Sequence, residues 1–441
     1  MEWIVFIIAT VVEIAFAVYC VVTNSNHKNA RNWLRVGAFT AFIIAVLVSV
    51  IKWSFRWYLL AALLLILAVI GGISLIIKRK DSKPYKPAVI ILKGVAVCII
   101  AAFTLVPALV FPQYRDPKIT GTYKVDTAVY TYVDKARTET FSNTGENRKV
   151  NVEFWYPEGT TGTYPLVVFS HGAFGVKNSN TSTYMELASN GYVVCSIDHP
   201  YHSFFTSDTD GHVTTVNPAY LQEIIDVNSD VYDDETAFKL EQNWMNVRAG
   251  DMNFVLDTIL NNTINADPEE VYKLIDTKHI GLMGHSLGGA ASAQVGRERK
   301  DIAAVINLDA DLLGEYKGIK DGKVVFNDQP YPLPILTIYS DTMTQAMEKA
   351  KQKGILDAGT NLAATAPYAF TVSIKGTNHM SLTDLPLFSP LLTNMICSSV
   401  HIGGGKEADK YYIIETMNRV VLDFFNCYLK DSGSFKYEGT Y

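Results

Sequence analysis

Four apolar runs fill the first 112 residues and limit what the chain can fold into. A helix needs about 20 apolar residues to cross the hydrocarbon core of a bilayer, and three of the runs have that length. The second run is shorter, but Trp33, Trp53 and Trp57 flank it and can lie at the membrane interfaces. Residues 61–77 are apolar on all sides, which disfavours a soluble bundle. The sequence therefore predicts an α-helical transmembrane region over residues 1–112, with four helices at about 3–22, 36–51, 55–77 and 89–111.

Charge divides the chain at the same place. Residues 1–112 hold 11 Lys and Arg against 3 Asp and Glu, whereas residues 113–441 hold 27 against 41. A basic, apolar front part joined to an acidic, more polar rear part is typical of a membrane anchor followed by a water-facing domain. The acidic balance of residues 113–441 also argues against nucleic acid as a partner.

The basic residues between the apolar runs predict an orientation. The first and third loops together carry eight Lys and Arg, whereas the second carries only Lys52 and Arg56. Basic loops stay in the cytoplasm, so the fourth helix leads outward and residues from about 113 onward face the extracytoplasmic side. A signal peptide is a weaker interpretation of the first run, because Glu2 stands where a basic cluster is usual. We therefore expect a multi-pass protein of the cell membrane.

Short apolar segments alternate with helical ones in residues 113–441. The helical segment 244–260 places Val247, Met252, Val255 and Ile259 on one side. This alternation predicts an α/β domain with a mostly parallel, doubly wound sheet. The strand-like segments are 122–133, 149–156, 166–170, 193–198, 279–283, 303–308, 335–339 and 370–374, and further helices are expected at 290–299 and 413–428.

A Gly-x-Ser-x-Gly motif lies between a predicted strand and a predicted helix. It reads Gly284-His285-Ser286-Leu287-Gly288-Gly289 and opens a helix of small residues. This placement is typical of the nucleophile turn of an α/β-hydrolase, where the serine occupies a strained turn and its neighbours two residues away must be small. The sequence therefore predicts Ser286 as the nucleophile of a serine hydrolase with the α/β-hydrolase fold.

A serine hydroxyl needs a general base. In this fold the base follows the nucleophile in the chain, and only His379 and His401 follow Ser286. His379 lies five residues after the last predicted strand, whereas His401 lies in a Gly-rich stretch typical of a surface loop. We therefore predict His379 as the base.

The base in turn needs an acid that orients it, and position leaves two main candidates. Asp309 follows the strand after the nucleophile helix, and Asp341 follows the next strand, which is the commoner place for the acid in this fold. Asp311 is a weaker third candidate, because a solvated position beside Asp309 explains it as well. The pattern alone favours Asp341.

Two backbone N–H groups are needed to hold the oxyanion of the reaction. The residue after the nucleophile, Leu287, supplies one of them in this fold. The second is expected from the loop after the strand 166–170, which reads His171-Gly172-Ala173-Phe174-Gly175. Within that loop Ala173 is placed for the task.

Four motifs of residues 113–441 form a recognisable set. They are His171-Gly172-Ala173-Phe174-Gly175, Asp198-His199-Pro200, Gly284-His285-Ser286-Leu287-Gly288-Gly289 and Asn307-Leu308-Asp309-Ala310. Together they resemble the platelet-activating factor acetylhydrolase family of the plasma, isoform II type, with dienelactone hydrolase-like proteins as relatives. The resemblance covers about residues 120–385. It implies Asp309 as the acid in place of Asp341, His379 as the base, and Ala173 and Leu287 as the oxyanion donors.

Two segments depart from the family pattern. Pro200-Tyr201-His202 stands where the family usually has an Arg-Asp type sequence, so contacts near the acyl pocket differ. The stretch 203–243 is long and polar and is a candidate lid insertion in the hydrolase domain of residues 113–441.

The expected function is therefore a membrane-anchored serine ester hydrolase that forms an acyl-enzyme. The resemblance implies short-chain acyl esters of lipids or lipophilic compounds as substrates. A cell-envelope peptidase or amidase of the same fold is an alternative, and a non-catalytic membrane sensor or binding protein is another. The reaction needs no metal or organic cofactor, and the five cysteines form no CxxC or Cys/His cluster. Cys397 and Cys427 can form a disulfide, but two buried thiols are favoured.

Overall fold

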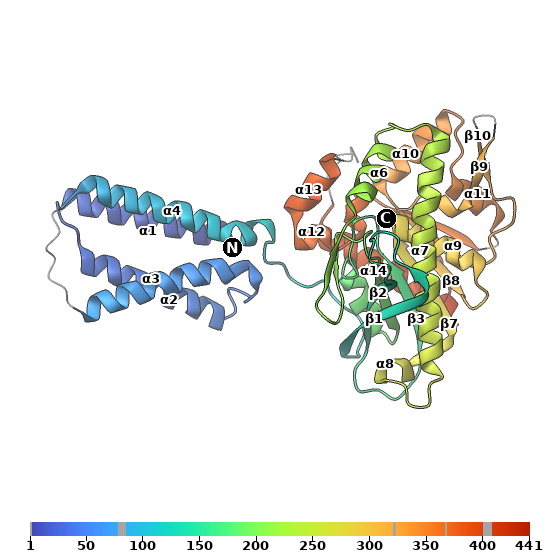
Figure 1. Cartoon of the computed structure of the whole chain (residues 1–441), viewed down its shortest axis with the longest axis horizontal. Helices are drawn as coiled ribbons and strands as arrows, with labels where there is room; N and C mark the ends of the chain where they lie inside the picture. The colour runs from blue at the N-terminus through green and yellow to red at the C-terminus, as the bar shows by residue number, and fades with distance from the viewer. Residues whose placement is uncertain (1, 78–84, 321–322, 367, 400–407) are drawn as a thin grey trace. The chain divides into compact units, whose positions relative to one another are not determined.

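The computed structural model describes residues 2–77, 85–320, 323–366, 368–399 and 408–441. The chain divides into two compact units. One comprises Met1–Arg115 with Leu387–Thr393, and the other comprises Asp116–Pro386 with Asn394–Tyr441. The helices of Met1–Arg115 are blue to cyan in Figure 1.

The first unit consists mainly of four long helices. Helix α1 packs against α4, and α2 packs against α3 (Figure 1). Phe42, Trp57 and Leu105 form a small buried cluster among them. The helices are α1 (Glu2–Val22), α2 (Lys28–Leu47), η1 (Phe55–Trp57), α3 (Tyr58–Ile76) and α4 (Pro87–Val110).

The second helix differs from the expected range 36–51. It begins at Lys28 because the mixed polar and apolar residues before Val36 include Ala30, Arg31 and Leu34, which favour a helix as strongly as the apolar run does. It ends at Leu47, and the backbone turns at Ser49, which has a φ of 59°. Apolar runs indicate where lipid contact is expected, but they do not mark where helical hydrogen bonding begins and ends.

Three helices of the described residues are long and apolar enough to cross a bilayer. They are Lys28–Leu47, Phe55–Ile76 and Pro87–Val110, so these are candidate membrane spans by length and composition. The stretch Thr10–Val22 of α1 is a further apolar helix.

The second unit is built around a sheet of nine strands in the order β1-β2-β4-β3-β7-β8-β11-β12-β13. The strands β3, β4, β7, β8, β11, β12 and β13 run parallel to one another, whereas β2 pairs antiparallel with β4, and β1 pairs antiparallel with β2 at the edge. The predicted mostly parallel sheet is therefore present. Its strands are β1 (Val125–Thr138), β2 (Asn147–Pro157), β3 (Tyr164–Ser170), β4 (Val193–Asp198), β7 (Ile275–His285), β8 (Ala304–Leu308), β11 (Ile335–Ser340), β12 (Ala369–Ile374) and β13 (Gly439–Thr440).

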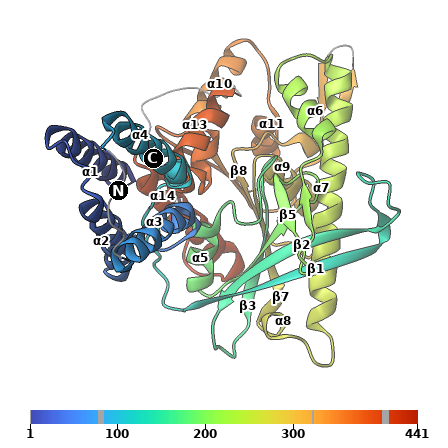
Figure 2. The same cartoon turned by 60° about the vertical axis from the view of Figure 1, so that its left-hand side comes forward.

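Helices cover both faces of this sheet because its strands are apolar on both sides. In β3, Leu166 and Val168 pack in one buried cluster with α7 and α9, and Val167 and Phe169 pack in a second cluster with α5 and α14. This alternation follows from the period of two in a strand. The covering helices are α5 (Thr181–Ser189), α7 (Asp234–Thr263), α9 (Leu287–Glu298) and α14 (Lys410–Leu429), all labelled in Figure 2.

The predicted lid segment 203–243 folds as a short hairpin followed by helices. It contains β5 (Phe205–Ser207), β6 (Val213–Thr215), α6 (Pro218–Asn228) and the first turns of α7. Asp233 caps α7 by accepting the Thr236 N–H. The segment therefore runs directly into a helix that covers the sheet.

The remaining elements are short or lie near the ends of strands. They are α8 (Glu270–Lys273), η2 (Leu313–Glu315), β9 (Tyr316–Lys320), β10 (Lys323–Phe326), α10 (Asp341–Gln352), α11 (Ala358–Thr365), η3 (His379–Leu382), α12 (Leu385–Phe388) and α13 (Pro390–Ser399). Cys397 and Cys427 are partly buried thiols in the described part of the chain, not a disulfide.

Candidate active site

Ser286 lies in a sharp turn between the end of β7 and the start of α9. Its φ of 53° and ψ of −130° are strained for a residue with a side chain. A Cβ on Gly284 would lie 2.2 Å from the Gly288 carbonyl oxygen, and one on Gly288 would lie 2.0 Å from the Ser170 carbonyl oxygen. The spacing of the motif thus has the steric reason expected from the sequence, because only glycine fits at either position.

Asp309 and His379 meet although they lie 70 residues apart. The His379 Nδ1 donates to Asp309 Oδ2 at 2.8 Å. Ser340 also donates to this carboxylate, with its N–H to Oδ1 at 2.6 Å and its hydroxyl to Oδ2 at 2.9 Å. Burial alone would raise the pKa of Asp309, but the hydrogen bonds from His379 and Ser340 hold it below its usual value. The carboxylate is therefore ionised and fixes a proton on His379 Nδ1.

The other acid candidates bind elsewhere. Asp341 begins α10 and accepts the Gly376 N–H at 3.2 Å through Oδ2. Both Asp311 oxygens accept the Tyr316 hydroxyl at 2.8 Å. The alternative base His401 lies outside the described residues. Of the carboxylates considered, the structure thus brings Asp309, and neither Asp341 nor Asp311, to His379.

His285 links the nucleophile turn to the loop that carries His379. Its Nε2 donates to the His379 carbonyl oxygen at 2.9 Å, and the two rings lie 4.6 Å apart. Burial and repulsion by His379 lower the pKa of His285 to about 3, so this side chain is neutral at ordinary pH. Since His285 precedes Ser286, this contact holds His379 beside the nucleophile turn. Sequence reasoning assigned no role to His285.

The loop after β3 lies against the nucleophile turn. A Cβ on Gly172 would lie 3.0 Å from the Ser286 Cβ and 2.9 Å from the His285 Nδ1. The loop closes as a turn in which the Gly175 N–H donates to the Gly172 oxygen at 3.1 Å, with Phe174 at a φ of 61°. A positive φ at the third position is typical of a type II turn.

Two N–H groups beside Ser286 take no acceptor from the described part of the chain. The Phe174 N–H donates to the His202 carbonyl oxygen at 3.1 Å, whereas the Ala173 N–H donates to no acceptor among the described residues. Leu287 is the first residue of α9, where N–H groups have no intrahelical acceptor. Leu287 directly follows Ser286, and Ala173 directly follows Gly172, which lies against Ser286. Neither of these two N–H groups has an acceptor among the described residues.

A buried polar cluster lies behind this loop, and the sequence reasoning missed it. Asp251 on α7 accepts from Arg148 Nε and Nη2, each at 2.7 Å, and from His199 Nδ1 at 3.0 Å. Asp251 and His199 are fully buried, and Arg148 is nearly so. Burial alone would raise the pKa of Asp251, but Arg148 and His199 hold it well below its usual value. The sequence does contain a sign of this cluster: Asp251 lies on the apolar side of the helix 244–260, and an unpaired charge is costly there.

Replacement of Asp251 by Ala should lower the free energy of unfolding of this unit by about 3–5 kcal/mol, because the buried Arg148 would lose its main counter-ion. Asp257→Ala is the matched control, since Asp257 also lies on α7 and pairs with Arg299 at 2.7 Å but is exposed. An exposed pair contributes about 0–1 kcal/mol. Thermal and urea unfolding of the purified chain measure both variants, and equal losses would contradict a special role for the buried cluster.

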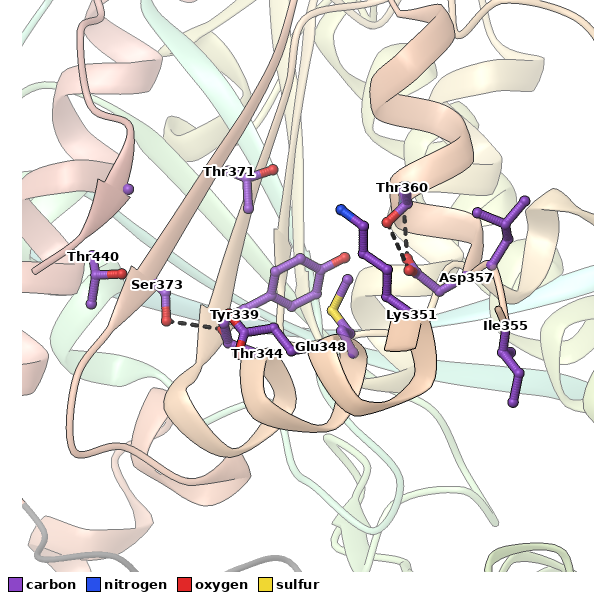
Figure 3. A pocket seen from close by; sticks show the side chains of 13 residues that line it. Tyr339, Thr344, Glu348, Lys351, Ile355, Asp357, Thr360, Thr371, Ser373 and Thr440 are labelled. Atoms are coloured by element: carbon purple, nitrogen blue, oxygen red, sulfur yellow. Dashed lines mark hydrogen bonds between the residues drawn. The ribbon is translucent and has the colours of Figure 1, made fainter. Parts of the chain in front are cut away.

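A cavity of about 280 Å³ lies elsewhere in this unit, where α10 and the start of α11 approach β11, β12 and β13 (Figure 3). Met347, Ile355 and Leu356 line it together with polar groups such as Lys351 and Asp357. None of the predicted catalytic residues lines it. Within the described residues there is also no group of three or more His, Cys, Asp or Glu side chains that could hold a metal ion.

Comparison with known proteins agrees with this geometry. Residues 134–437 match the family described as platelet-activating factor acetylhydrolase, isoform II. The chain belongs to this family. The resemblance inferred from the sequence is therefore confirmed, and the match includes β2 to β12 and the turn that carries Ser286.

Individual relatives of the platelet-activating factor acetylhydrolase family are distant. The dog protein named platelet-activating factor acetylhydrolase is 30% identical over 172 residues, which are 36% of this chain and 37% of the relative. The chicken protein of the same name is 25% identical over 243 residues, 51% of this chain and 54% of the relative. The chain thus spans about a third to a half of the length of the curated relatives it matches.

Among solved structures, a ferulic acid esterase from Streptomyces cinnamoneus superposes with a TM-score of 0.53 at 19% identity. The superposition covers 74% of this chain and 94% of the esterase. At this identity the likeness shows the fold alone. The predicted α/β-hydrolase fold is confirmed for this member of the platelet-activating factor acetylhydrolase family.

Proposed function

We propose that this chain is a membrane-anchored serine ester hydrolase with Ser286, His379 and Asp309 as its catalytic residues. The observation that carries the proposal is the Asp309–His379 hydrogen bond, held beside a strained serine turn. Acyl transfer also requires a site for the oxyanion, and the Ala173 and Leu287 N–H groups, which have no acceptor among the described residues, can provide it.

The proposed reaction has two steps. His379 Nε2 accepts the proton of the Ser286 hydroxyl while its Oγ bonds to the ester carbonyl carbon. The carbonyl oxygen becomes an oxyanion and accepts hydrogen bonds from the Ala173 and Leu287 N–H groups. The carbon–oxygen bond to the alcohol then breaks, and His379 gives its proton to the leaving oxygen. Water, activated by His379, releases the acid from Ser286.

Asp309 supports this cycle by fixing the tautomer of His379. Because Nδ1 carries the proton that binds Asp309, the Nε2 lone pair is available to Ser286. The ionised carboxylate also stabilises the imidazolium formed in each step. Burial of Asp309 strengthens this interaction, since little solvent competes for the carboxylate.

We propose that the N-terminal helices anchor the enzyme in a membrane with the catalytic unit on the extracytoplasmic side. Ile66, Val69 and Ile73 of α3 are exposed in the chain by itself, and such an apolar surface is unfavourable in water. The basic residues of the first and third loops support the orientation. Cysteine accessibility on intact cells tests it, because the Lys149→Cys variant should react with a membrane-impermeant thiol reagent and the Arg35→Cys variant should not.

We propose short-chain acyl esters of lipids or lipophilic alcohols as the substrate class, supported by the family and by the membrane anchor. A fluorophosphonate probe should label the wild-type chain on the peptide that contains Ser286, and purified chain should cleave acetyl and butyryl esters of lipid analogues. Absence of labelling would contradict the serine hydrolase proposal. Labelling together with cleavage of amides rather than esters would support a peptidase or amidase.

A further inference from the structure

Arg248 contacts the backbone of the loop that contains Ala173. It lies on α7 and is fully buried. Its Nη1 donates to the His171 carbonyl oxygen at 2.6 Å, and its Nη2 donates to the Gly172 carbonyl oxygen at 3.1 Å. Its Nε donates to His202 Nδ1 at 3.3 Å. One guanidinium thus holds two consecutive carbonyl groups beside the nucleophile turn.

The Arg248 cation has no carboxylate partner in an ion pair among the described residues, unlike Arg148 in the neighbouring cluster. A buried cation is costly unless hydrogen bonds and opposite charges compensate it. Two backbone carbonyls and an imidazole do so here. Apolar side chains of similar volume are often as stabilising as buried ionic groups, so stability alone does not account for the contacts of Arg248 with the loop.

The anchored carbonyls determine where the N–H groups of the loop point. In a planar trans peptide the C=O and the N–H point in opposite directions. Since the His171 and Gly172 oxygens face Arg248, the N–H groups of Gly172 and Ala173 face away from it. Gly172, which carries the second of these carbonyl groups, lies against Ser286, since a Cβ on it would lie 3.0 Å from the Ser286 Cβ.

We propose that Arg248 is a positioning residue for the oxyanion hole: by holding the two carbonyls it directs the Ala173 N–H toward the oxygen that becomes charged at Ser286. This inference rests on the proposed ester hydrolase function. Arg248 does not touch the reacting atoms and acts through the peptide groups.

The charge of Arg248 adds to the effect of its geometry. The cation polarises the Gly172 carbonyl, and the same peptide group then presents a more positive N–H on its far side. Such a preorganised dipole stabilises the charge of the transition state more than it stabilises the uncharged ester. Loss of Arg248 should therefore lower kcat with little change in KM.

Two substitutions test the role of Arg248. Arg248→Lys keeps the charge but can hold only one carbonyl well, and Arg248→Gln removes the charge. Loss of one oxyanion donor lowers kcat by about 10²–10³-fold. A misdirected Ala173 N–H should therefore lower kcat by about 10-fold in Arg248→Lys and by about 100-fold in Arg248→Gln. Active sites are counted by fluorophosphonate titration, and kcat and KM for an acetyl ester are expressed per titrated site.

Inhibition by a trifluoromethyl ketone distinguishes a role in the oxyanion hole from a purely structural role of Arg248. It adds to the serine hydroxyl and places an oxyanion in the same position as the reaction does. Its inhibition constant should rise by the same factor by which kcat/KM falls, whereas KM should change less than about 3-fold. Arg148→Lys is the matched control, since it alters a buried guanidinium that does not contact the His171 or Gly172 carbonyls. It should lower stability and leave the inhibition constant unchanged.

Each outcome decides for or against the inference. Unchanged kcat per titrated site in both Arg248 variants would overturn it, as would a fall in kcat with no change in the inhibition constant. Failure of both variants to fold while Arg148→Lys folds would also overturn it, because Arg248 would then serve stability. A wild-type chain that neither reacts with fluorophosphonate nor cleaves esters would instead contradict the proposed function.

Discussion

Replacement of Ser286 by Ala should lower kcat/KM for ester hydrolysis by about 10⁴–10⁶-fold, because it removes the hydroxyl that forms the covalent intermediate. Fluorophosphonate labelling should be lost in parallel. The residual rate should still exceed that of water, because the Ala173 and Leu287 N–H groups remain to hold the oxyanion. Hydrolysis of a chromogenic acetyl ester and labelling with a fluorescent fluorophosphonate measure the two effects.

Ser292→Ala is the control for this variant. Ser292 lies six residues after Ser286 on α9, is fully buried, and donates to the Gly288 carbonyl oxygen at 2.8 Å. Its loss should cost about 1 kcal/mol of stability and leave labelling intact. Retention of labelling by Ser286→Ala, or an equal loss of activity in Ser286→Ala and Ser292→Ala, would show that Ser286 is not the nucleophile.

The sheet and the nucleophile turn could be predicted because their reasons are local. A buried parallel strand is a short apolar run, so the segments 166–170, 193–198 and 335–339 fall within β3, β4 and β11. The turn at Ser286 needs small residues on both sides, and the spacing of the glycines shows this directly. Neither prediction required knowledge of contacts between distant segments.

The choice of the acid could not be made in that way. Asp309 and Asp341 each directly follow an apolar strand, and β8 and β11 are neighbours in the sheet. Which side chain reaches His379 depends on the backbone, and Asp309 turns with a φ of 57°. Position favoured Asp341, and only the family resemblance implied Asp309, to which the structure brings His379.

The contacts of the buried charged residues behind the loop that contains Ala173 could not be predicted from the sequence either. Arg248 and Asp251 lie one turn apart on α7, yet they belong to different contacts. Arg248 holds the loop after β3, whereas Asp251 binds Arg148 from β2 and His199 from the end of β4. A periodic apolar pattern predicts the helix but cannot indicate which distant backbone groups its buried charges meet.

Asp309→Asn should lower kcat/KM by about 10⁴-fold while the chain stays folded. The contacts of Ser340 explain the size of the effect. The Ser340 N–H requires an acceptor at the Oδ1 position, so the amide oxygen of the introduced side chain would occupy it and the amide NH2 would face His379. His379 would then have to accept at Nδ1 and carry its proton on Nε2. In that tautomer it cannot take the proton of Ser286.

Asp341→Asn is the matched comparison, because it changes the same atoms at the end of the neighbouring strand. Asp341 only accepts the Gly376 N–H through Oδ2, and an amide oxygen can accept that hydrogen bond equally well. Its kcat/KM should therefore stay within about 3-fold of the wild-type value. Both variants are compared by kcat/KM per titrated active site and by melting temperature. A larger loss in Asp341→Asn than in Asp309→Asn would show that Asp341, and not Asp309, is the acid that orients His379 in catalysis.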